Sequence, residues 1–206
     1  MSSNISHDIN VFYPIVPDID WLRRIVPLGV KTVQLRLKDA SESEARRQIA
    51  GSLKIAKAHG ATLIVNDYWR LAIEQGARWI HLGQEDLAAA DLAAIKRAGL
   101  KLGISTHSEA ELDVALAAEP DYIALGPIYE TKLKAMTWAP QGLDRLTVWK
   151  RAIGPLPLVA IGGITPDRAP LVVAAGATSI AVITDFLTHP DPVERIKTWT
   201  SWAESR

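Results

Sequence analysis

Eight short apolar runs that alternate with helical segments predict an α/β fold, a single-domain (β/α)₈ barrel over residues 1–206. The runs are almost continuously apolar, as strands covered on both faces should be. The segments between them carry apolar residues at helical spacing, and strict alternation of this kind implies parallel strands with right-handed crossovers. An open, doubly wound sheet is the alternative that the same alternation allows.

The eight predicted strands are short and spread over most of the chain, which leaves no room for a linker or a second domain. In order, they cover Val11–Val16, Thr32–Leu37, Thr62–Asn66, Trp79–Leu82, Lys101–Ser105, Tyr122–Gly126, Leu158–Ile161 and Ser179–Ile183.

The joints between elements have their own signals. Glycine closes a helix because it readily adopts the left-handed conformation, and a glycine precedes many of the strands. Such glycines are Gly29, Gly60, Gly76, Gly99 and Gly176. Helix starts are predicted at two capping boxes, Ser41-x-x-Glu44 and Ser108-x-x-Glu111, and at Thr165-Pro166, where a cap precedes a proline.

Composition excludes several classes of function. Lys+Arg and Asp+Glu are equal at 23 each, so no overall field attracts nucleic acid or anionic lipid. The absence of cysteine excludes disulfides, thiolate–zinc sites and thiol catalysis. The N-terminal stretch does not resemble a signal peptide, and no apolar run reaches the ~20 residues that span a bilayer. We therefore expect a soluble, cytoplasmic protein that binds small molecules, without nucleic-acid or membrane partners.

The oligomeric state stays open in the sequence. Seven tryptophans, including Trp199 and Trp202 near the C-terminus, are consistent with a homo-oligomer interface or with core packing of a helix face.

Polar residues concentrate where the predicted strands end, which is where barrels bind their ligands. In the second strand, alternation places Gln34, Arg36 and Lys38 on one face. If the apolar residues between them pack against helices, these three point into the barrel mouth. Two inward cations then require an anion, because burying unpaired charge is costly. A strand with a solvated edge is the alternative interpretation.

Carboxylates follow the next two strands. Asn66-Asp67 ends the third strand, and Asp86 lies shortly after the fourth. Mg²⁺ commonly uses one or two carboxylates together with substrate phosphate, so these residues, near Arg36 and Lys38, predict a diphosphate–magnesium site. Asp67 is equally consistent with a helix N-cap, and Asp86 less so, because we expect it in a long loop that contains glycine.

The fifth strand ends at Ser105, followed by Thr106 and His107. Ser105 is a candidate ligand contact because Ser108 already serves as the cap of the next helix. His107 is more consistent with a structural role, and the spacing alone establishes no Ser/His/Asp arrangement.

A second anion site is predicted at the last strands. The longest connection follows the sixth strand and offers Thr131 and Lys134, whereas Gly162-Gly163 follows the seventh. Glycines there allow a ligand to approach the backbone closely, and Ile183-Thr184 ends the eighth strand. Backbone N–H groups at this position bind phosphate in many barrels.

The chain resembles the thiamine phosphate synthase family from about Val11 to Asp185. The resemblance is carried by five motifs that follow one another on successive strand ends. They are VQLRLKD, LIVNDYWRLAIEQGARWIHLGQEDL, LGISTHSEAEL, DYIALGPIYETKLK and LVAIGGITPDRA.

The resemblance implies two substrates, 4-amino-5-hydroxymethyl-2-methylpyrimidine diphosphate and 4-methyl-5-(2-phosphoethyl)thiazole, the latter commonly carboxylated. It implies one Mg²⁺ per subunit, held by Asp67 and Asp86. The implied contacts to the pyrimidine diphosphate are Gln34, Arg36, Lys38, Asn66, Ser105 and Lys134. The implied contacts to the thiazole phosphate are Thr131, Lys132, Leu133, Gly162, Ile183 and Thr184.

The family's reaction is dissociative: pyrophosphate leaves, the aminopyrimidine stabilises the methylene cation, and the thiazole nitrogen captures it. Such chemistry needs no protein nucleophile, and the resemblance implies that Arg36, Lys38, Ser105 and Lys134 act on the leaving group. Two segments depart from the family pattern. Leu133 replaces a usual threonine, and Thr184-Asp185 replaces a serine and a small residue, so we expect the thiazole-phosphate site to differ in detail.

Three other functions remain in view. A related thiazole tautomerase shares the barrel, but it need not bind a diphosphate–metal pair, so the set of cations and carboxylates argues against it. A degenerate barrel that binds thiamine intermediates without catalysis is supported only by the two departures. A phosphosugar isomerase rests on fold alone, and fold does not decide function.

Overall fold

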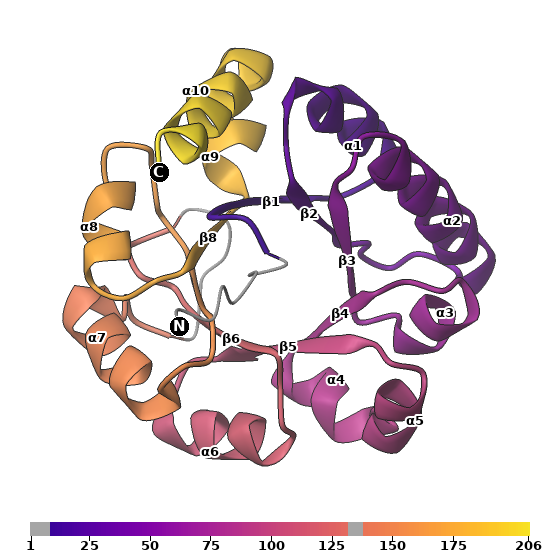
Figure 1. Cartoon of the computed structure of the whole chain (residues 1–206), viewed down its shortest axis with the longest axis horizontal. Helices are drawn as coiled ribbons and strands as arrows, with labels where there is room; N and C mark the ends of the chain where they lie inside the picture. Colours follow the sequence, from indigo (N-terminus) through magenta and orange to yellow (C-terminus); the bar gives the residue numbers. More distant parts are fainter. Residues whose placement is uncertain (1–8, 132–137) are drawn as a thin grey trace, which may run out of the picture.

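A computed structural model of the chain describes residues 9–131 and 138–206. Its strands form a closed ring in which each strand pairs in parallel with the next and β8 pairs with β1 (Figure 1). This confirms the predicted fold class and excludes the open sheet. The extent of the domain, residues 1–206, stays a prediction. The strands are β1 Phe12–Val16, β2 Thr32–Leu35, β3 Thr62–Asn66, β4 Trp79–Leu82, β5 Lys101–Thr106, β6 Tyr122–Leu125, β7 Leu158–Ile161 and β8 Ser179–Val182.

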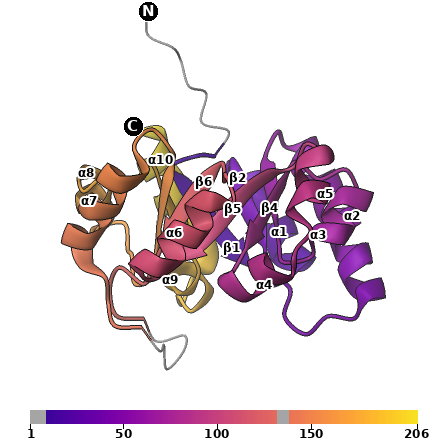
Figure 2. The same ribbon diagram turned by 90° about the horizontal axis from the view of Figure 1, so that it is seen from below.

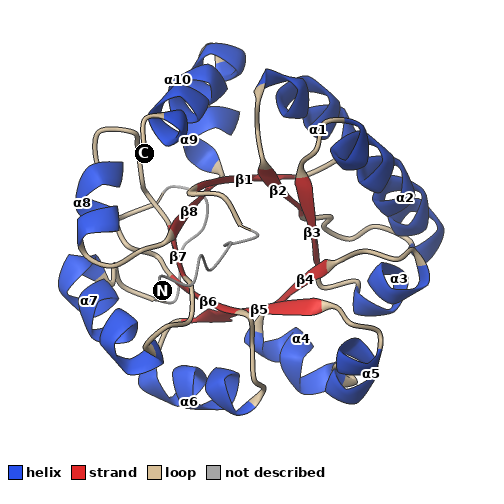
Figure 3. Ribbon diagram, in the orientation of Figure 1, coloured by secondary structure: helices blue, strands red, loops and turns tan. Residues whose placement is uncertain are grey.

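The helices lie outside the ring of strands (Figure 3). The short helices α4 and α9 directly follow β4 and β8, and they mark the end of the barrel where the strands finish (Figure 2). The helices are α1 Ile19–Ile25, α2 Glu42–Ala58, α3 Trp69–Glu74, α4 Gln84–Ala89, α5 Leu92–Arg97, α6 Glu109–Ala117, α7 Gly142–Ile153, α8 Ala169–Ala174, α9 Thr184–Leu187 and α10 Pro192–Glu204, with a 3₁₀ turn over Val26–Leu28.

Alternation along the strands divides the core into two layers. Val33, Leu35 and Leu37 belong to the larger layer between strands and helices, as the sequence predicted. Their neighbour Gln34 is 1% exposed and faces the interior of the barrel. The interior layer contains Ile9, Tyr13, Ile15, Ile64, Trp79, Tyr122, Ala124, Val159 and Ala181.

Most predicted joints are confirmed. The five predicted helix-ending glycines all have positive φ, between 64° and 113°. Ser41 and Ser108 each accept a hydrogen bond from the backbone N–H three residues ahead, at 3.3 Å. The predicted helix start at Thr165-Pro166 is wrong, because α8 begins at Ala169. A turn intervenes, in which the N–H groups of Arg168 and Ala169 both donate to the Thr165 carbonyl at 3.0 Å.

The predicted second strand extends two residues too far. Its partner β1 ends at Val16, which lies opposite Leu35, so the ladder with β1 ends there. One further hydrogen bond, from Arg36 N to the Val16 carbonyl at 2.9 Å, carries the backbone toward the barrel mouth.

The C-terminal tryptophans pack within the chain. Trp199 is fully buried and stacks on Phe12 with ring centroids 5.1 Å apart, and Trp202 meets Trp199 edge to face. Core packing therefore accounts for Trp199, while the oligomeric state stays open. Within residues 9–131 and 138–206, no helix is both long enough and apolar enough to cross a membrane.

Asp185, one of the departures from the family pattern, anchors α10 to the end of β8. Its two carboxylate oxygens accept hydrogen bonds from Arg195 at 2.7 and 2.8 Å, and one also accepts from the Trp199 indole N–H at 2.8 Å. The Asp185 side chain is only 12% exposed. Its carboxylate is thus engaged with α10, which gives this departure a structural reason.

We expect Asp185→Ala to lower the free energy of unfolding by about 2 kcal/mol, because it removes charge-assisted hydrogen bonds and leaves Arg195 without its partner. Urea unfolding at neutral pH measures the change. Asp20→Ala is the matched control, since it removes an exposed ion pair with Arg23 that should contribute little. Equal losses in the two variants would contradict the anchor.

Candidate active site

The mouth of the barrel, at the carboxyl ends of the strands, brings together the cation and the carboxylates predicted there. Arg36 is exposed just beyond β2, and its charge acts on two groups: it partly offsets the raised pKa of Asp67 and adds to the effect of burial in lowering the pKa of His81. Lys38 is exposed two residues further along, so the prediction that both cations are buried is wrong, and the cost of burying charge does not by itself require an anion here. Arg36 therefore lies within electrostatic reach of two neighbouring strand ends.

Asp67 and Asp86 come from different strand ends, and they lie close enough for the Asp86 carboxyl to affect the pKa of Asp67. Burial and the nearby Asp86 carboxyl raise the pKa of Asp67 to about 6, while Arg36 and the Gly83 N–H partly offset that rise. Asp67 also accepts a hydrogen bond from the Asn66 side chain and has a left-handed backbone, with φ of 65°. A crowded carboxyl pair of this kind is a site that a cation would stabilise.

Neither aspartate serves as a helix N-cap. The residue that precedes α3 is Tyr68, and no side chain caps that helix, so the capping interpretation of Asp67 is wrong. Asp86 lies in the first turn of α4, whose N-cap is Gly83, and not in a long loop as we expected. Helix capping therefore does not account for either carboxylate at the barrel mouth.

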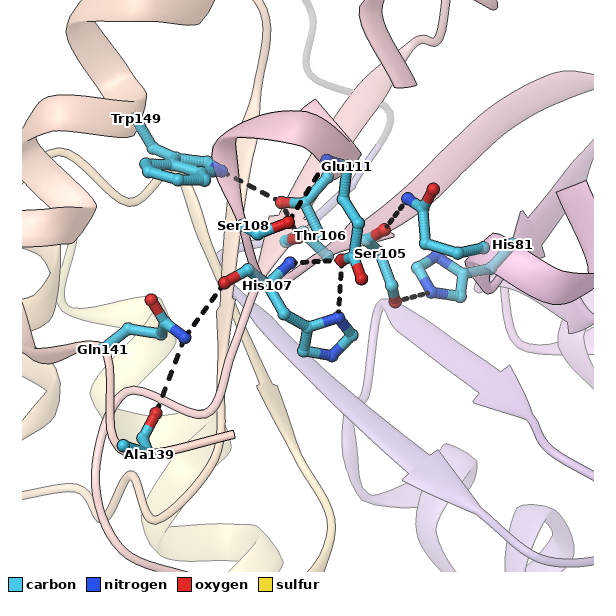
Figure 4. Close-up of polar contacts among 11 residues, drawn as sticks. His81, Ser105, Thr106, His107, Ser108, Glu111, Ala139, Gln141 and Trp149 are labelled. Carbon is cyan, nitrogen blue, oxygen red and sulfur yellow. Dashed lines mark hydrogen bonds and ion pairs between the residues drawn. The ribbon is translucent and has the colours of Figure 1, made fainter. Parts of the chain in front are cut away.

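A continuous chain of polar contacts crosses the barrel interior below the mouth. The Gln34 amide donates to the Tyr13 hydroxyl, which lies 3.1 Å from the Tyr122 hydroxyl. Tyr122 Oη lies 2.7 Å from Nδ1 of His81. Nε2 of His81 lies 2.7 Å from Oγ of Ser105 (Figure 4). The chain therefore connects β2, β1, β6, β4 and β5.

Gly103 on β5 makes this chain sterically feasible. A side chain at position 103 would overlap the ring and hydroxyl of Tyr122, which is fully buried. The register places Gly103 beside both His81 and Tyr122, so the ring fills the space that a side chain would take. The Tyr122 hydroxyl consequently reaches the His81 imidazole.

His81 and Ser105 do not form an activated nucleophile. Burial, with a smaller contribution from Arg36, lowers the pKa of His81 to about 4, so its imidazole is neutral at physiological pH and a weak base. Its other nitrogen faces the phenol of Tyr122, whereas hydrolytic triads place a carboxylate there to stabilise the imidazolium. The arrangement favours a hydrogen-bonding Ser105 over a covalent one.

The contacts of His107 indicate a structural role. Its Nδ1 lies 2.9 Å from a carboxylate oxygen of Glu111, and its ring stacks on Trp138 with centroids 5.6 Å apart. The Gln141 side chain donates to the His107 carbonyl at 3.2 Å (Figure 4). His107 thus connects the end of β5 to residues that precede α7.

The second predicted anion site lies at the ends of β7 and β8. Gly162 and Gly163 both have positive φ, and a side chain at either would overlap the connection after β6. The Gly162 carbonyl accepts a hydrogen bond from Tyr129 N at 3.0 Å. These glycines are therefore required by the packing of two chain segments, apart from any ligand.

Some of the residues predicted to contact the second anion lie within the described part of the chain, and others do not. Thr131, Ile183 and Thr184 are half-buried, and Thr184 begins α9 directly after β8. The predicted contacts Lys132, Leu133 and Lys134 lie outside the described residues.

Three members of the interior chain were not predicted from the sequence: Tyr13, His81 and Tyr122. The two-residue alternation in Trp79-Ile80-His81-Leu82 could have indicated an inward His81, since Ile80 and Leu82 belong to the outer layer. The contact between Tyr122 and His81 spans the intervening strand β5, and its signal is the glycine at position 103.

A (β/α)₈ barrel with a cation, a carboxyl pair and a hydroxyl at the carboxyl ends of its strands has the architecture of a barrel enzyme. A sequence model of the family described as thiamine monophosphate synthase matches residues 12–186. The chain belongs to that family and is a transferase.

Individual relatives agree. The chain is 59% identical over 191 residues to a thiamine-phosphate synthase of Rhizobium etli, covering 93% of this chain and 94% of the relative. It is 49% identical to a thiamine-phosphate synthase of Cronobacter sakazakii over 87% of this chain and 85% of that one. A thiamine phosphate pyrophosphorylase structure from Pyrococcus furiosus superposes with a TM-score of 0.82 at 26% identity, covering 94% and 95% of the two chains.

The crowded carboxyl pair predicts an unusual pH dependence of stability in the absence of metal. Because the pKa of Asp67 is raised, the folded protein holds its proton more tightly than the unfolded chain does, and this contribution to stability falls as pH rises from about 4 to about 6. We expect Asp86→Asn to be more stable than the wild type at pH 7.5 in EDTA, since the repulsion is removed. The advantage should shrink toward pH 3.5, where Asp67 is protonated and no longer repels its neighbour.

Thermal unfolding at the two pH values measures this difference. Glu85→Gln, a change at the exposed neighbouring residue of α4, is the control. A gain in stability that is equal at both pH values would show that repulsion with Asp67 is not its cause.

Proposed function

We propose that this protein is a thiamine phosphate synthase, which joins 4-amino-5-hydroxymethyl-2-methylpyrimidine diphosphate to 4-methyl-5-(2-phosphoethyl)thiazole, commonly carboxylated, and releases pyrophosphate. Family membership supports this reaction class. The observation that carries the proposal is the Asp67–Asp86 pair within electrostatic reach of Arg36. We place the reaction in the cytoplasm.

Asp67 and Asp86 fit Mg²⁺, one ion per subunit. Two neighbouring carboxylates, together with the phosphate oxygens that the substrate would bring, match the preference of this ion for oxygen ligands. Among the described residues, no group of three or more acidic, histidine or cysteine side chains could hold a metal ion, so substrate and water would supply the remaining ligands. When bound, the ion would neutralise charge on the leaving diphosphate.

The reaction breaks one bond and forms another. The C–O bond between the pyrimidine methylene and the diphosphate breaks, and its electron pair leaves with pyrophosphate. The electron-rich aminopyrimidine stabilises the resulting methylene cation, and the lone pair of the thiazole nitrogen then forms the new C–N bond. The protein's contribution is to hold the two substrates in line and to stabilise the charge that develops on the leaving group.

Residues near the carboxyl pair would bind the pyrimidine diphosphate. Arg36, Lys38 and Lys134 would supply positive charge to the departing pyrophosphate, and Ser105 a hydrogen bond. Asn66, buried at the end of β3, donates to Asp67 and would border the same space. Gln34, buried on β2, donates to Tyr13 just below the mouth and would contact the substrate from there.

The thiazole phosphate would bind at the ends of β7 and β8. Gly162, Ile183 and Thr184 offer backbone and hydroxyl groups there, and Thr131, Lys132 and Leu133 follow β6. The Asp185 carboxylate is engaged with Arg195 and Trp199, so it leaves this site to Thr184. This arrangement supports a working thiazole site despite the departure from the family pattern.

Incubation of the purified protein with both substrates and Mg²⁺ tests the proposal. We expect thiamine phosphate and pyrophosphate to form in equal amounts. Chromatography measures thiamine phosphate, and a coupled assay measures pyrophosphate. Absence of thiamine phosphate with either form of the thiazole would refute the function.

The metal assignment has its own test. We expect Asp67→Ala and Asp86→Ala each to reduce turnover at least about tenfold, because loss of one carboxylate weakens the ion and exposes the diphosphate charge. Glu85→Ala is the matched control, since Glu85 is an exposed acid on the same helix as Asp86. Full turnover by either aspartate variant in excess EDTA would remove these residues from metal binding.

A further inference from the structure

The chain of hydrogen bonds through the barrel interior has a direction. The Gln34 amide nitrogen donates to the Tyr13 oxygen, so the Tyr13 hydrogen is available to the Tyr122 oxygen. Tyr122 then donates to Nδ1 of His81, at 2.7 Å. A neutral imidazole that accepts at Nδ1 carries its hydrogen on Nε2 and donates it to Ser105 Oγ.

The opposite direction leaves a buried group unsatisfied. If Ser105 donated to His81, then His81 would donate to Tyr122, and Tyr122 to Tyr13. The Tyr13 hydrogen would then face only the Gln34 amide nitrogen, which is itself a donor. Tyr13 is 1% exposed, and an unpaired buried hydroxyl is costly.

This direction leaves Ser105 with its own hydrogen to offer. Ser105 is half-buried at the end of β5, whereas His81 and Tyr122 behind it are buried. Its backbone carbonyl is already engaged, accepting from the Gln84 amide at 2.6 Å, so the strand end is held in place. The hydroxyl hydrogen can therefore point toward a ligand in the barrel mouth.

We propose that His81, itself held by Tyr122, is a positioning residue that fixes the Ser105 hydroxyl as a hydrogen-bond donor to the departing pyrophosphate. This inference rests on the proposed function and assigns a role to residues that do not touch the reacting atoms. No proton is transferred in the step. As the C–O bond breaks, negative charge grows on the leaving oxygen, and a donor already aligned there stabilises it more than the ground state.

Tyr122→Phe tests the role of the phenol most directly. It retains the ring that packs against Gly103 and removes the donor to His81, so the imidazole can adopt either tautomer. We expect the single-turnover rate of pyrophosphate release to fall about three- to tenfold. The dissociation constant of the pyrimidine diphosphate should remain nearly unchanged.

A double-mutant cycle separates positioning from a structural role. If Tyr122 acts through Ser105, then Tyr122→Phe has no further effect on the rate in the Ser105→Ala background. Two rate losses that multiply independently would overturn the proposal, as would a Tyr122→Phe enzyme with the wild-type rate.

Thr106→Val is the matched control. Thr106 is the next residue on β5, and its buried hydroxyl faces the other way, donating to the Ala124 carbonyl and accepting from Trp149 Nε1, both at 2.9 Å (Figure 4). We expect this variant to lose stability and to keep its single-turnover rate. A rate loss in Thr106→Val equal to that in Tyr122→Phe would indicate that any buried hydroxyl has this effect, and would overturn the proposal.

His81 variants provide an independent measurement if Tyr122→Phe does not fold. His81→Gln keeps an amide that can donate to Ser105, whereas His81→Leu does not, so the glutamine variant should retain more of the rate. Equal rates in the two variants would overturn the proposal. Wild-type protein that forms no thiamine phosphate refutes the proposed function and this inference together, whereas an active wild type with equal His81 variants refutes this inference alone.

Discussion

Closure of the parallel strands into a ring commits every second side chain of each strand to the barrel interior. An open sheet could place polar side chains at an edge, but a closed barrel has none, so interior polar groups must satisfy one another or lie at the mouth. Gln34, Tyr13, Tyr122 and His81 satisfy one another, and Ser105 ends the series where the strands end. Closure of the barrel therefore accounts both for the series of buried polar contacts and for the position of Ser105 at the proposed active site.

The protein has equal numbers of acidic and basic residues, so the charge at the barrel mouth depends on where individual side chains lie. The ends of the neighbouring strands β3 and β4 bring Asp67 and Asp86 together. Arg36 lies close enough to reduce the electrostatic cost of ionising Asp67 beside Asp86. The left-handed backbone of Asp67 and its raised pKa both indicate a conformation that is maintained against local preference. Strain of this kind at the barrel mouth agrees with the proposed role of the pair in binding a cation.

The fold was largely predictable because short-range patterns determine it. Apolar runs and helix-ending glycines located the strands to within two residues, and the error at β2 came from the length of its partner β1. The site was only partly predictable. Strand ends identified Asp67 and Asp86 as candidates, whereas the contact between His81 and Tyr122 depends on register across β5 and on a vacant Cβ position. The helix start at Thr165 failed because a hydrogen-bonded turn competes with the cap.

Gly103 and Tyr122 behave as a single steric unit, with consequences for how this barrel can diverge. A methyl group at position 103 would displace the Tyr122 ring, and displacement would cut the polar series between Tyr13 and His81. Neither residue can therefore drift alone without a cost to the other, and a library that redesigns the interior should vary both positions together. Descendants of this sequence that lose the glycine should also replace the tyrosine, and their barrels would need another way to orient the hydroxyl on β5.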